Sequence, residues 1–320
     1  MNLAASPAPA VVQLDGVSVF YGEVIGLSRL DLRLDRGVTG LIGPNGSGKS
    51  TLMRMLTGLI APVEGRVRVL GGDPFTDASV RARIALVPAS ESFHRDLSGR
   101  ANLEIAFLAR GHDRAAARSA AARALDLSGL GDAAHRSYGS WSRGMRQRLK
   151  LGLALAVDAP LVLLDEPFLG VDPPSRRALR DQIARLGEEG RTVVVSSHVL
   201  HEIESLTDHV AVLARGRLLG LGRVEALLHD LRDRHPHRIA VELADPRALG
   251  GALLQMAHVR EIALTGPDEI TFMTVEPTVA YRELTACIAR LGLSVRRVRV
   301  LDGSLESAFE EITRGGSRLL

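Results

Sequence analysis

Apolar residues form two alternating patterns along the first two-thirds of the chain. Continuous runs of leucine and β-branched residues, at 161–165 and 192–197, are bounded by turn-forming residues. Such runs are typical of parallel strands that are buried on both faces of a sheet. Segments with helical spacing lie between the strand-like runs, for example at 51–58. The alternation predicts an α/β domain over residues 11–224, preceded by a flexible tail at 1–10.

The last third of the chain has a different order of elements. Strand and helix patterns follow as β-α-β-β-α-β at residues 237–243, 245–256, 259–266, 268–275, 279–292 and 294–302. This is the split βαβ, or ferredoxin-like, order. We therefore predict a small C-terminal α+β domain over 238–320, with a short last helix at 304–314. A linker at 225–237 is expected to join it to the first domain.

The composition is that of a soluble folded protein and gives no sign of a nucleic-acid partner. Apolar residues make up 46%, charged residues 24% and aromatic residues 3%, and the formal net charge is only +3. Basic residues are interleaved with acidic ones, and stacking platforms for bases would be poorly supplied. The most apolar run, 151–157, is far shorter than the ~20 residues that span a bilayer. The N-terminus lacks the pattern of a secretory signal. The single cysteine, Cys287, fits a reducing cytoplasm and a buried helix position.

A glycine-rich loop between a predicted strand and a predicted helix gives the first chemical signal. The P-loop (Walker A) pattern G-x-x-x-x-G-K-[ST] is matched by Gly43, Pro44, Asn45, Gly46, Ser47, Gly48, Lys49 and Ser50, with Thr51 next. Its glycines let backbone N–H groups point at a phosphate, and the helix N-terminus adds positive potential. Among 40 basic residues only Lys49 and Lys150 are lysine, and a compact ammonium reaches between phosphates where a guanidinium is larger. The loop therefore predicts nucleotide binding.

Two carboxylates after a buried strand pattern extend this chemistry to hydrolysis. Asp165 ends the run LVLLD, and Glu166 follows it. An aspartate there holds Mg²⁺ together with the hydroxyl of Ser50, and a glutamate polarises an attacking water. Taken alone, the pair could be a plain strand exit. Beside the phosphate loop, Ser50 and Asp165 are predicted metal ligands and Glu166 a predicted catalytic residue.

Downstream of the loop, the stretch WSRGM at 141–145 resembles the LSGGQ signature of the ABC ATPases, and the following QRL is similar too. By itself the stretch could be an ordinary capped helix. The resemblance implies that Ser142 and Gly144 bind the phosphate of ATP. It also implies a P-loop ABC ATPase fold with a helical subdomain at about 90–157.

Further positions agree with the same family. Residues 170–173 resemble its D-loop, which makes Asp172 a nucleotide-site residue, and His198 stands at the switch-histidine position. Tyr21 lies where these ATPases stack an aromatic ring on adenine. Taken singly, His198 could be a strand-end histidine and Tyr21 a core aromatic.

The resemblance covers residues 11–220 and implies ATP and Mg²⁺ as cofactors. In such ATPases two chains, or a pair of related chains, sandwich ATP between the P-loop of one and the signature of the other. The family also implies a membrane permease as partner. The chain would then be cytoplasmic and peripheral on the inner face of the membrane.

Two departures from the family pattern affect expected chemistry. Ala89 stands where the family usually has a glutamine that touches Mg²⁺ and the attacking water, and Arg143 replaces the first signature glycine. Slower hydrolysis or altered coupling is expected rather than lost binding. Phe93, Leu97 and Phe107 are candidate permease contacts, with internal packing of the helical subdomain as the alternative.

Three functions compete. They are the ATPase subunit of a transporter, a soluble non-transport ABC ATPase and a weakly hydrolysing regulatory subunit. One cassette without a long coiled-coil insertion favours transport, and Glu166 and His198 argue against a dead ATPase. The residues at 141–149 and the tail stretch SLESAFEEIT resemble those of ABC-2-type exporter subunits. Importer ATPases are the alternative.

Overall fold

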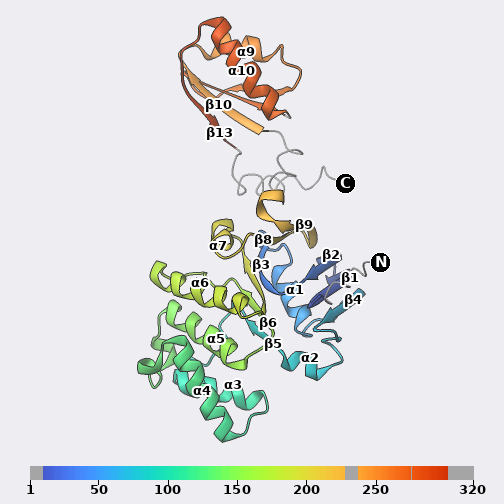
Figure 1. Ribbon diagram of the computed structural model, residues 1–320, viewed down its shortest axis with the longest axis vertical. Helices are drawn as coiled ribbons and strands as arrows, with labels where there is room; N and C mark the ends of the chain where they lie inside the picture. Colours follow the sequence, from blue (N-terminus) through green and yellow to red (C-terminus); the bar gives the residue numbers. More distant parts are fainter. Residues whose placement is uncertain (1–9, 228–236, 275, 302–320) are drawn as a thin grey trace, which may run out of the picture. The chain divides into compact units, whose positions relative to one another are not determined.

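The computed structural model describes residues 10–227, 237–274 and 276–301, and the chain divides into two compact units between Arg223 and Val224 (Figure 1). Parts of the expected tail and linker, and the expected helix at 304–314, lie outside the described residues. Each unit is therefore described by itself. Within the first unit, strands and helices alternate as the apolar pattern predicted.

A six-stranded sheet forms the centre of the first unit, in the order β5-β6-β7-β3-β8-β9. Its strands are β3 (Gly37–Ile42), β5 (Ile84–Val87), β6 (Leu161–Asp165), β7 (Thr192–Ser197), β8 (His209–Ala214) and β9 (Arg217–Arg223). All pairs are parallel except the terminal hairpin β8–β9. Every residue of β6 and β7 is buried, which confirms the prediction of central strands from their continuous apolar runs.

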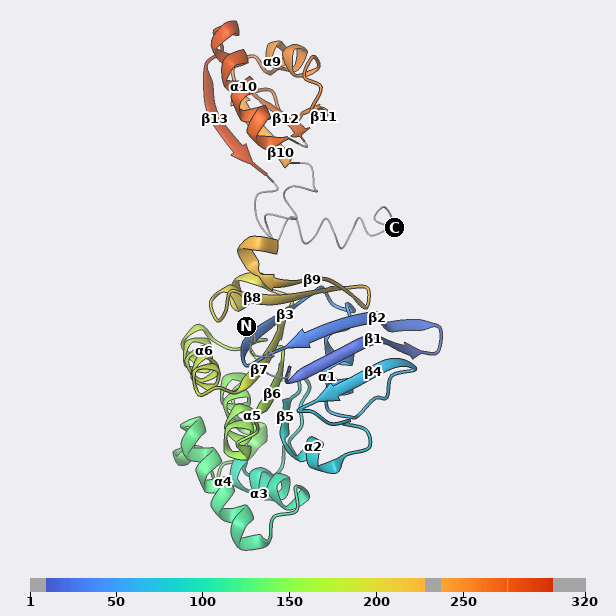
Figure 2. The same cartoon turned by 45° about the vertical axis from the view of Figure 1, so that its right-hand side comes forward.

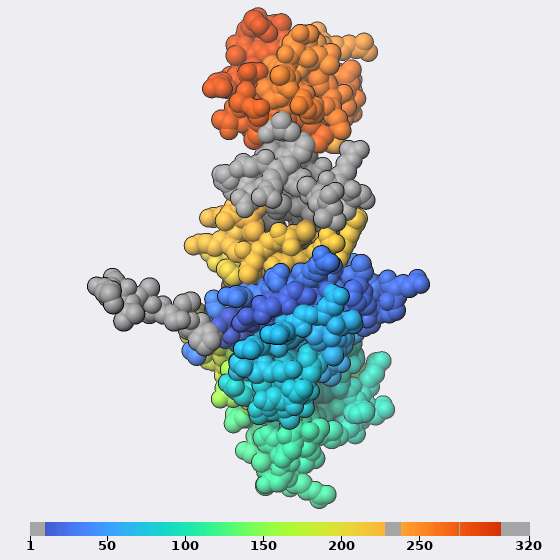
Figure 3. Space-filling view, turned by 90° about the vertical axis from the view of Figure 1, so that its right-hand side faces the viewer, coloured from blue at the N-terminus to red at the C-terminus, as the bar shows by residue number. Residues whose placement is uncertain are grey.

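A second, three-stranded antiparallel sheet lies beside the first and shares its core. It consists of β1 (Val12–Tyr21), β2 (Val24–Leu34) and β4 (Glu64–Val69), in the order β2-β1-β4. Buried residues of both sheets form one cluster with α1 (Lys49–Leu56). Figure 2 shows the three strands side by side, and Figure 3 shows their blue to cyan residues as one continuous surface. The sequence predicted these strands without showing that they form a separate sheet.

Helices α3 (Gly99–Ala109), α4 (Arg114–Ser128) and α5 (Arg143–Val157) form a helical subdomain with its own core. Ser98 and Asp113 cap the first two by accepting backbone N–H bonds at 3.1 and 2.8 Å. α4 buries an alanine-rich face and ends at Gly129, whose φ of 65° suits glycine. Two short 3-10 turns, Gly131–Ala133 and Tyr138–Ser140, lead into α5.

The remaining helices of the first unit are α2 (Ala78–Ala82), α6 (Pro173–Glu188) and α7 (Leu200–Glu204). Helix α6 follows β6, and α7 follows β7, as the crossovers of a parallel sheet require. The loops at the carboxyl ends of β3, β6 and β7 therefore come together at one edge of the sheet. In open α/β sheets this edge is where ligands bind.

The second unit has the predicted order β-α-β-β-α-β. Its elements are β10 (His237–Leu243), α9 (Pro246–Leu253), β11 (Val259–Leu264), β12 (Glu269–Thr274), α10 (Pro277–Leu291) and β13 (Val295–Val300). The sheet is antiparallel, in the order β11-β12-β10-β13, and Figure 1 shows both helices on one of its faces. Alternate β10 residues point into the core with both helices, and Cys287 of α10 is buried there as predicted.

Asn102 is a buried polar residue that fastens the loop before α3, so its loss should destabilise the helical subdomain. Its side chain accepts from His94 N at 2.8 Å and donates to His94 O at 2.9 Å and Ser98 O at 3.1 Å. Asn102→Ala should lower the free energy of unfolding by about 2–3 kcal/mol, because it leaves backbone polar groups unpaired. Fluorescence of the single tryptophan, Trp141, which is buried in this core, would follow the melting.

The matched control is Leu108→Ala on the same helix, where the side chain is 43% exposed and the change should be within about 0.5 kcal/mol. Equal melting of the Asn102 variant and the wild type would contradict the prediction.

Candidate functional site

A cavity of about 560 Å³, which we call the P-loop cavity, lies at the carboxyl ends of the parallel strands. It is lined by Tyr21, Val24, Ile25, Gly26, Asn45, Gly46, Ser47, Gly48, Lys49, Ser50, Thr51, Ala89, Glu166, Leu169 and His198. Strand register aligns its parts, since Asp165 pairs with Ser196 across β6 and β7, and Ile42 pairs with Ser197 across β3 and β7. The fold thus brings the predicted phosphate loop, Glu166 and His198 into one cavity.

The glycine loop depends on backbone conformations that suit glycine. Gly46 and Gly48 have φ angles of 81° and 108°, in the left-handed region. A Cβ at Gly43 would lie 2.4 Å from Leu213 O, and one at Gly48 would lie 2.7 Å from Gly26 O. The loop can therefore follow this path only with glycine at these positions.

The helix that follows the loop begins without a side-chain cap. Gly48 is the N-cap residue of α1, whereas Ser and Asp side chains cap α3, α4, α5 and α6. The first-turn N–H groups of α1 are thus available to an anion at the helix N-terminus. Ser47 Oγ is also buried there and finds no hydrogen-bond partner among the described residues. Both features suit a bound phosphate.

Lys49 is buried and held by the loop it serves. Its Nζ donates to Gly43 O at 2.6 Å and Pro44 O at 3.2 Å, and lies 3.5 Å from Glu166 Oε1. Burial lowers the pKa of Lys49 from its ordinary value, and the nearby Glu166 carboxylate opposes this shift. A phosphate near Nζ would add negative charge and raise this pKa again.

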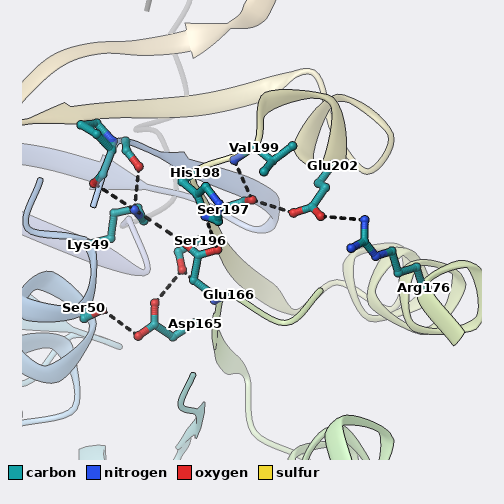
Figure 4. Close-up of polar contacts among 12 residues, drawn as sticks. Lys49, Ser50, Asp165, Glu166, Arg176, Ser196, Ser197, His198, Val199 and Glu202 are labelled. Carbon is teal, nitrogen blue, oxygen red and sulfur yellow. Dashed lines mark hydrogen bonds and ion pairs between the residues drawn. The ribbon is translucent and has the colours of Figure 1, made fainter. Parts of the chain in front are cut away.

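The predicted metal ligands lie side by side. Ser50 Oγ donates to Asp165 Oδ2 at 2.8 Å, and Ser196 Oγ donates to the other carboxylate oxygen at 2.7 Å (Figure 4). The same Ser196 hydroxyl accepts from Glu166 N at 2.9 Å. Ser196 thus orients both carboxylate residues. Sequence analysis missed it, because a serine inside the run TVVVSS carries no signal of its own.

Glu166 and His198 form the centre of the cavity. His198 Nδ1 lies 2.9 Å from Glu166 Oε2, a distance at which the ring N–H donates to the carboxylate. Glu166 has a φ of 48°, an unusual value for a non-glycine residue and a mark of strain at functional sites. His198 directly follows β7, so a strand-end histidine satisfied by this hydrogen bond stays the alternative to a catalytic role.

Tyr21 lies at the mouth of the cavity and is 45% exposed, so its interpretation as a core aromatic is wrong. Its hydroxyl donates to Thr51 Oγ1 at 3.4 Å. Val24 and Ile25 are exposed by 66% and 51% beside it and line the same cavity. The three side chains offer an apolar surface to a flat ring. Sequence analysis did not single out the two aliphatic ones, which lie at the start of β2.

The signature and D-loop residues lie elsewhere. None of Ser142, Gly144 and Asp172 is among the residues that line the P-loop cavity. Ser142 Oγ caps α5 by accepting from Met145 N at 3.2 Å, and Asp172 caps α6 by accepting from Ser175 N at 3.0 Å. Hydrogen bonds from Ser175 lower the pKa of Asp172. A Cβ at Gly144 would lie 2.9 Å from Asp172 Oδ2, so glycine permits this close packing.

The two departures from the family pattern meet beside Glu166. Ala89 and Arg143 line a smaller cavity of about 220 Å³ together with Glu166. A Cβ at Gly170 would lie 2.4 Å from Arg143 Nη1, so the guanidinium packs against that glycine. The exposed Ala89 leaves room on this side of Glu166 for a larger side chain.

The loop around Ala89 is fastened to the signature helix by the second lysine. Lys150 Nζ donates to Ser90 O at 2.7 Å and Pro88 O at 3.3 Å, and lies 3.5 Å from Glu91 Oε1. Arg146 pairs with the other Glu91 oxygen at 3.1 Å. Neither Ser90 nor Glu91 is among the residues that line the P-loop cavity.

The proposed permease contacts differ in exposure. Phe107 is 1% exposed in the helical core, so its interpretation as a surface contact is wrong and internal packing is confirmed. Phe93 is partly buried, with its ring 5.4 Å from that of Tyr138 in an edge-on arrangement. Leu97 is also half-buried.

Comparisons with known proteins give similar sequences along most of the chain. A family model described as ABC transporter matches residues 27–169. The daunorubicin/doxorubicin resistance ATP-binding protein DrrA of Streptomyces peucetius is 33% identical, over 94% of this chain and 92% of that protein. The bacitracin transport ATP-binding protein BcrA of Enterococcus faecalis is 28% identical, over 96% of this chain and 97% of that protein.

Solved structures match about two-thirds of the chain, a share similar to that of the first unit. The ATP-binding subunit of an ABC transporter gives a TM-score of 0.61 at 26% identity, over 70% of this chain and 92% of the other. An ATP-binding cassette in a dimeric post-hydrolysis state, bound to ADP and Pi, gives 0.60 at 24% identity, over 67% and 98%. The second of these likenesses is one of fold alone.

Removing the Lys49 ammonium should weaken ATP binding while leaving the fold intact. A charge-assisted hydrogen bond is worth about 1.5–3 kcal/mol, so Lys49→Ala should raise the Kd for MgATP by about 10- to 100-fold. Calorimetric titration would measure it. Lys150→Ala, which removes the other lysine, is the control and should leave the Kd nearly unchanged.

The lowered pKa also sets a pH dependence. Phosphate raises the pKa of Lys49, so binding takes up a proton and ATP affinity should fall as the pH rises through the lowered pKa of the free protein. This fall should be absent from Lys49→Ala. An unchanged Kd for MgATP in that variant would show that Lys49 does not contribute to ATP binding.

Proposed function

This chain belongs to the family of ABC transporter ATP-binding proteins and is an ATPase, and we propose that it supplies the energy of an exporter. The observation that carries the proposal is the cavity in which Lys49, Glu166 and His198 meet, while the signature residues lie outside it. Such a site is complete for binding the phosphates of ATP from one side only. A second copy must supply the other side.

In the proposed reaction, the loop N–H groups and Lys49 hold the phosphate chain, with the ammonium exchanging its loop carbonyls and Glu166 for phosphate oxygens. Glu166 then orients a water molecule toward the γ-phosphate and accepts its proton. His198, hydrogen-bonded to Glu166, keeps that carboxylate in line. Tyr21, Val24 and Ile25 provide the surface for adenine.

The residues beside the loop fit a magnesium ion. Ser50 and Asp165 offer a hydroxyl and a carboxylate, the hard oxygen ligands that Mg²⁺ prefers. Within the described residues, no group of three or more His, Cys, Asp or Glu side chains could hold a metal. Phosphate oxygens and water would therefore complete the coordination of the ion, as is usual for nucleotide sites. When bound, it would neutralise charge on the β- and γ-phosphates.

We further propose that two chains close on ATP as an isologous pair. The Ser142 hydroxyl accepts from Met145 N and keeps its own proton free to donate to a phosphate oxygen. Gly144 follows at the N-terminus of α5, where the helix dipole favours an anion. Asp172 and the D-loop beside it would face the partner chain in the same closure.

Export through a membrane permease is favoured by the relatives that match along nearly the whole chain. Their names describe drug resistance and bacitracin transport. A relative with a shorter match, the Nod factor export ATP-binding protein I of Sinorhizobium fredii, is 33% identical over 72% of this chain and 67% of that protein. The described helices include none that is long and apolar enough to cross a membrane. A permease would hold the chain at the inner face of the membrane. A soluble ATPase role and a weakly hydrolysing regulatory role are the alternatives.

Pairing on ATP can be tested by stopping hydrolysis. Glu166→Gln should lower turnover by about 100-fold or more, because it removes the carboxylate that orients the water. With MgATP this variant should elute as a dimer in size-exclusion chromatography with light scattering. Adding Ser142→Asp should abolish the dimer, because aspartate keeps the helix cap but repels the phosphates. A dimer that survives Ser142→Asp would rule out this pairing.

The effect of Ala89 can be measured by restoring the family residue. Ala89→Gln places an amide in the free space beside Glu166, and one further hydrogen bond of about 1 kcal/mol would raise the rate about fivefold. Ser90→Gln carries the same side chain one position on, outside the cavity, and should not change turnover. Equal rates in steady-state ATPase assays of Ala89→Gln and wild type, with and without the permease, would refute the expectation.

A further inference from the structure

We propose that Arg176 and Glu202 are a positioning pair that holds His198 in its reactive place and couples it to the D-loop at 170–173. This inference rests on the proposed role of His198 in ATP hydrolysis. Neither residue lines the P-loop cavity, so both would act through the backbone segments that they hold.

Arg176 connects the D-loop to helix α7. It lies in the first turn of α6, directly after the D-loop, and its Nε donates to Val171 O at 2.9 Å. The far side of the same guanidinium places Nη1 3.1 Å from Glu202 Oε1 (Figure 4). A planar guanidinium can make both contacts at once because its donors point in fixed, different directions.

Glu202 continues the connection to the strand end that carries His198. Its second oxygen accepts from Ser197 Oγ at 2.7 Å, and the Ser197 hydroxyl accepts from Val199 N at 3.0 Å. Ser197 is fully buried, and the Glu202 side chain is only 12% exposed. The residues on both sides of His198 are therefore fixed by one carboxylate.

Such support matters because surrounding side chains do not fix the orientation of the partly exposed His198 ring. Its side chain is 39% exposed, and its contact with Glu166 Oε2 is a single hydrogen bond of 2.9 Å. The direction of that hydrogen bond depends on the backbone on both sides of the ring. Misplacing a reacting group by about 1 Å can cost about 100-fold in rate, so loss of the pair should appear in catalysis.

The contacts form one continuous path from Val171 O to Val199 N. The D-loop lies in the segment proposed to face the second copy, so a displacement there would pull on Arg176 and, through Glu202, on the backbone around His198. The pair thereby links pairing of two chains to alignment of the catalytic centre.

A neighbouring arginine supplies a matched control. Arg176, Arg177 and Glu202 all line one cavity of about 320 Å³ between α6 and α7, which leaves room for altered side chains. Arg177 follows Arg176 on the same helix and is exposed. Arg177→Met therefore makes the same change of charge and side-chain size as Arg176→Met, but it leaves the contacts between Val171 and Val199 in place.

The test compares full-length Arg176→Met, Glu202→Gln, the double variant and Arg177→Met. In steady-state assays the first two should lower kcat by about 10- to 100-fold while the Kd for MgATP stays within about twofold of wild type. The double variant should be no slower than the slower single variant, because both changes break one path. Arg177→Met should keep the wild-type kcat.

Melting curves and ATP affinity separate positioning from general support of the fold. An unchanged kcat in both single variants would overturn the proposal. So would a loss of kcat that comes with an equal loss of ATP affinity or a lowered melting midpoint, because that describes a structural role. A wild-type chain and Arg177→Met that both fail to hydrolyse ATP would overturn the proposed function itself, together with this inference.

Discussion

The site depends on one buried ammonium group. Lys49 Nζ lies among two loop carbonyls and the Glu166 carboxylate, in a cavity whose walls take it out of water. Burial lowers the pKa of Lys49, so the charge is costly until an anion arrives. Helix α1 has no side-chain cap, and the Ser47 hydroxyl finds no partner among the described residues. A phosphate chain would accept from the first-turn N–H groups of α1 and from the Lys49 ammonium together.

The loops around this charge are held by side chains from neighbouring helices rather than by their own packing. Lys150 of α5 donates to the carbonyls of Pro88 and Ser90 around Ala89, and Arg176 of α6 donates to Val171 of the D-loop. Loops that carry catalytic groups lie at the surface, where few apolar contacts fix them. Charged side chains that reach a backbone carbonyl supply the missing restraint.

Ser142 and Gly144 lie outside the P-loop cavity, so in the proposed dimer the partner chain would complete this site. At the N-terminus of helix α5, the Ser142 hydroxyl accepts from Met145 N and can still donate its own proton. The P-loop cavity offers donors that suit an anion. Two identical chains related by a two-fold axis would complete two such sites at once. In the proposed dimer, the free energy of ATP binding would bring the two surfaces together.

The sequence by itself determined most of the elements and the loop that the structure places in the P-loop cavity. Continuous apolar runs predicted the central strands, the β-α-β-β-α-β order predicted the elements of the second unit, and the spacing of Gly43 to Ser50 predicted the phosphate loop. These are local signals, carried by residues that are neighbours in the chain. Only the tertiary structure decided that β1, β2 and β4 form a separate sheet, and that Phe107 is buried and Tyr21 exposed.

The tertiary structure also decided the contacts of Ser196 and of the pair Arg176 and Glu202. Their partners lie 31 and 26 residues away in the chain, counted from Asp165 to Ser196 and from Arg176 to Glu202. A hydrogen bond between distant residues exists only because parallel strands end at the same edge and their crossover helices lie beside one another. No local pattern of residue types encodes that proximity.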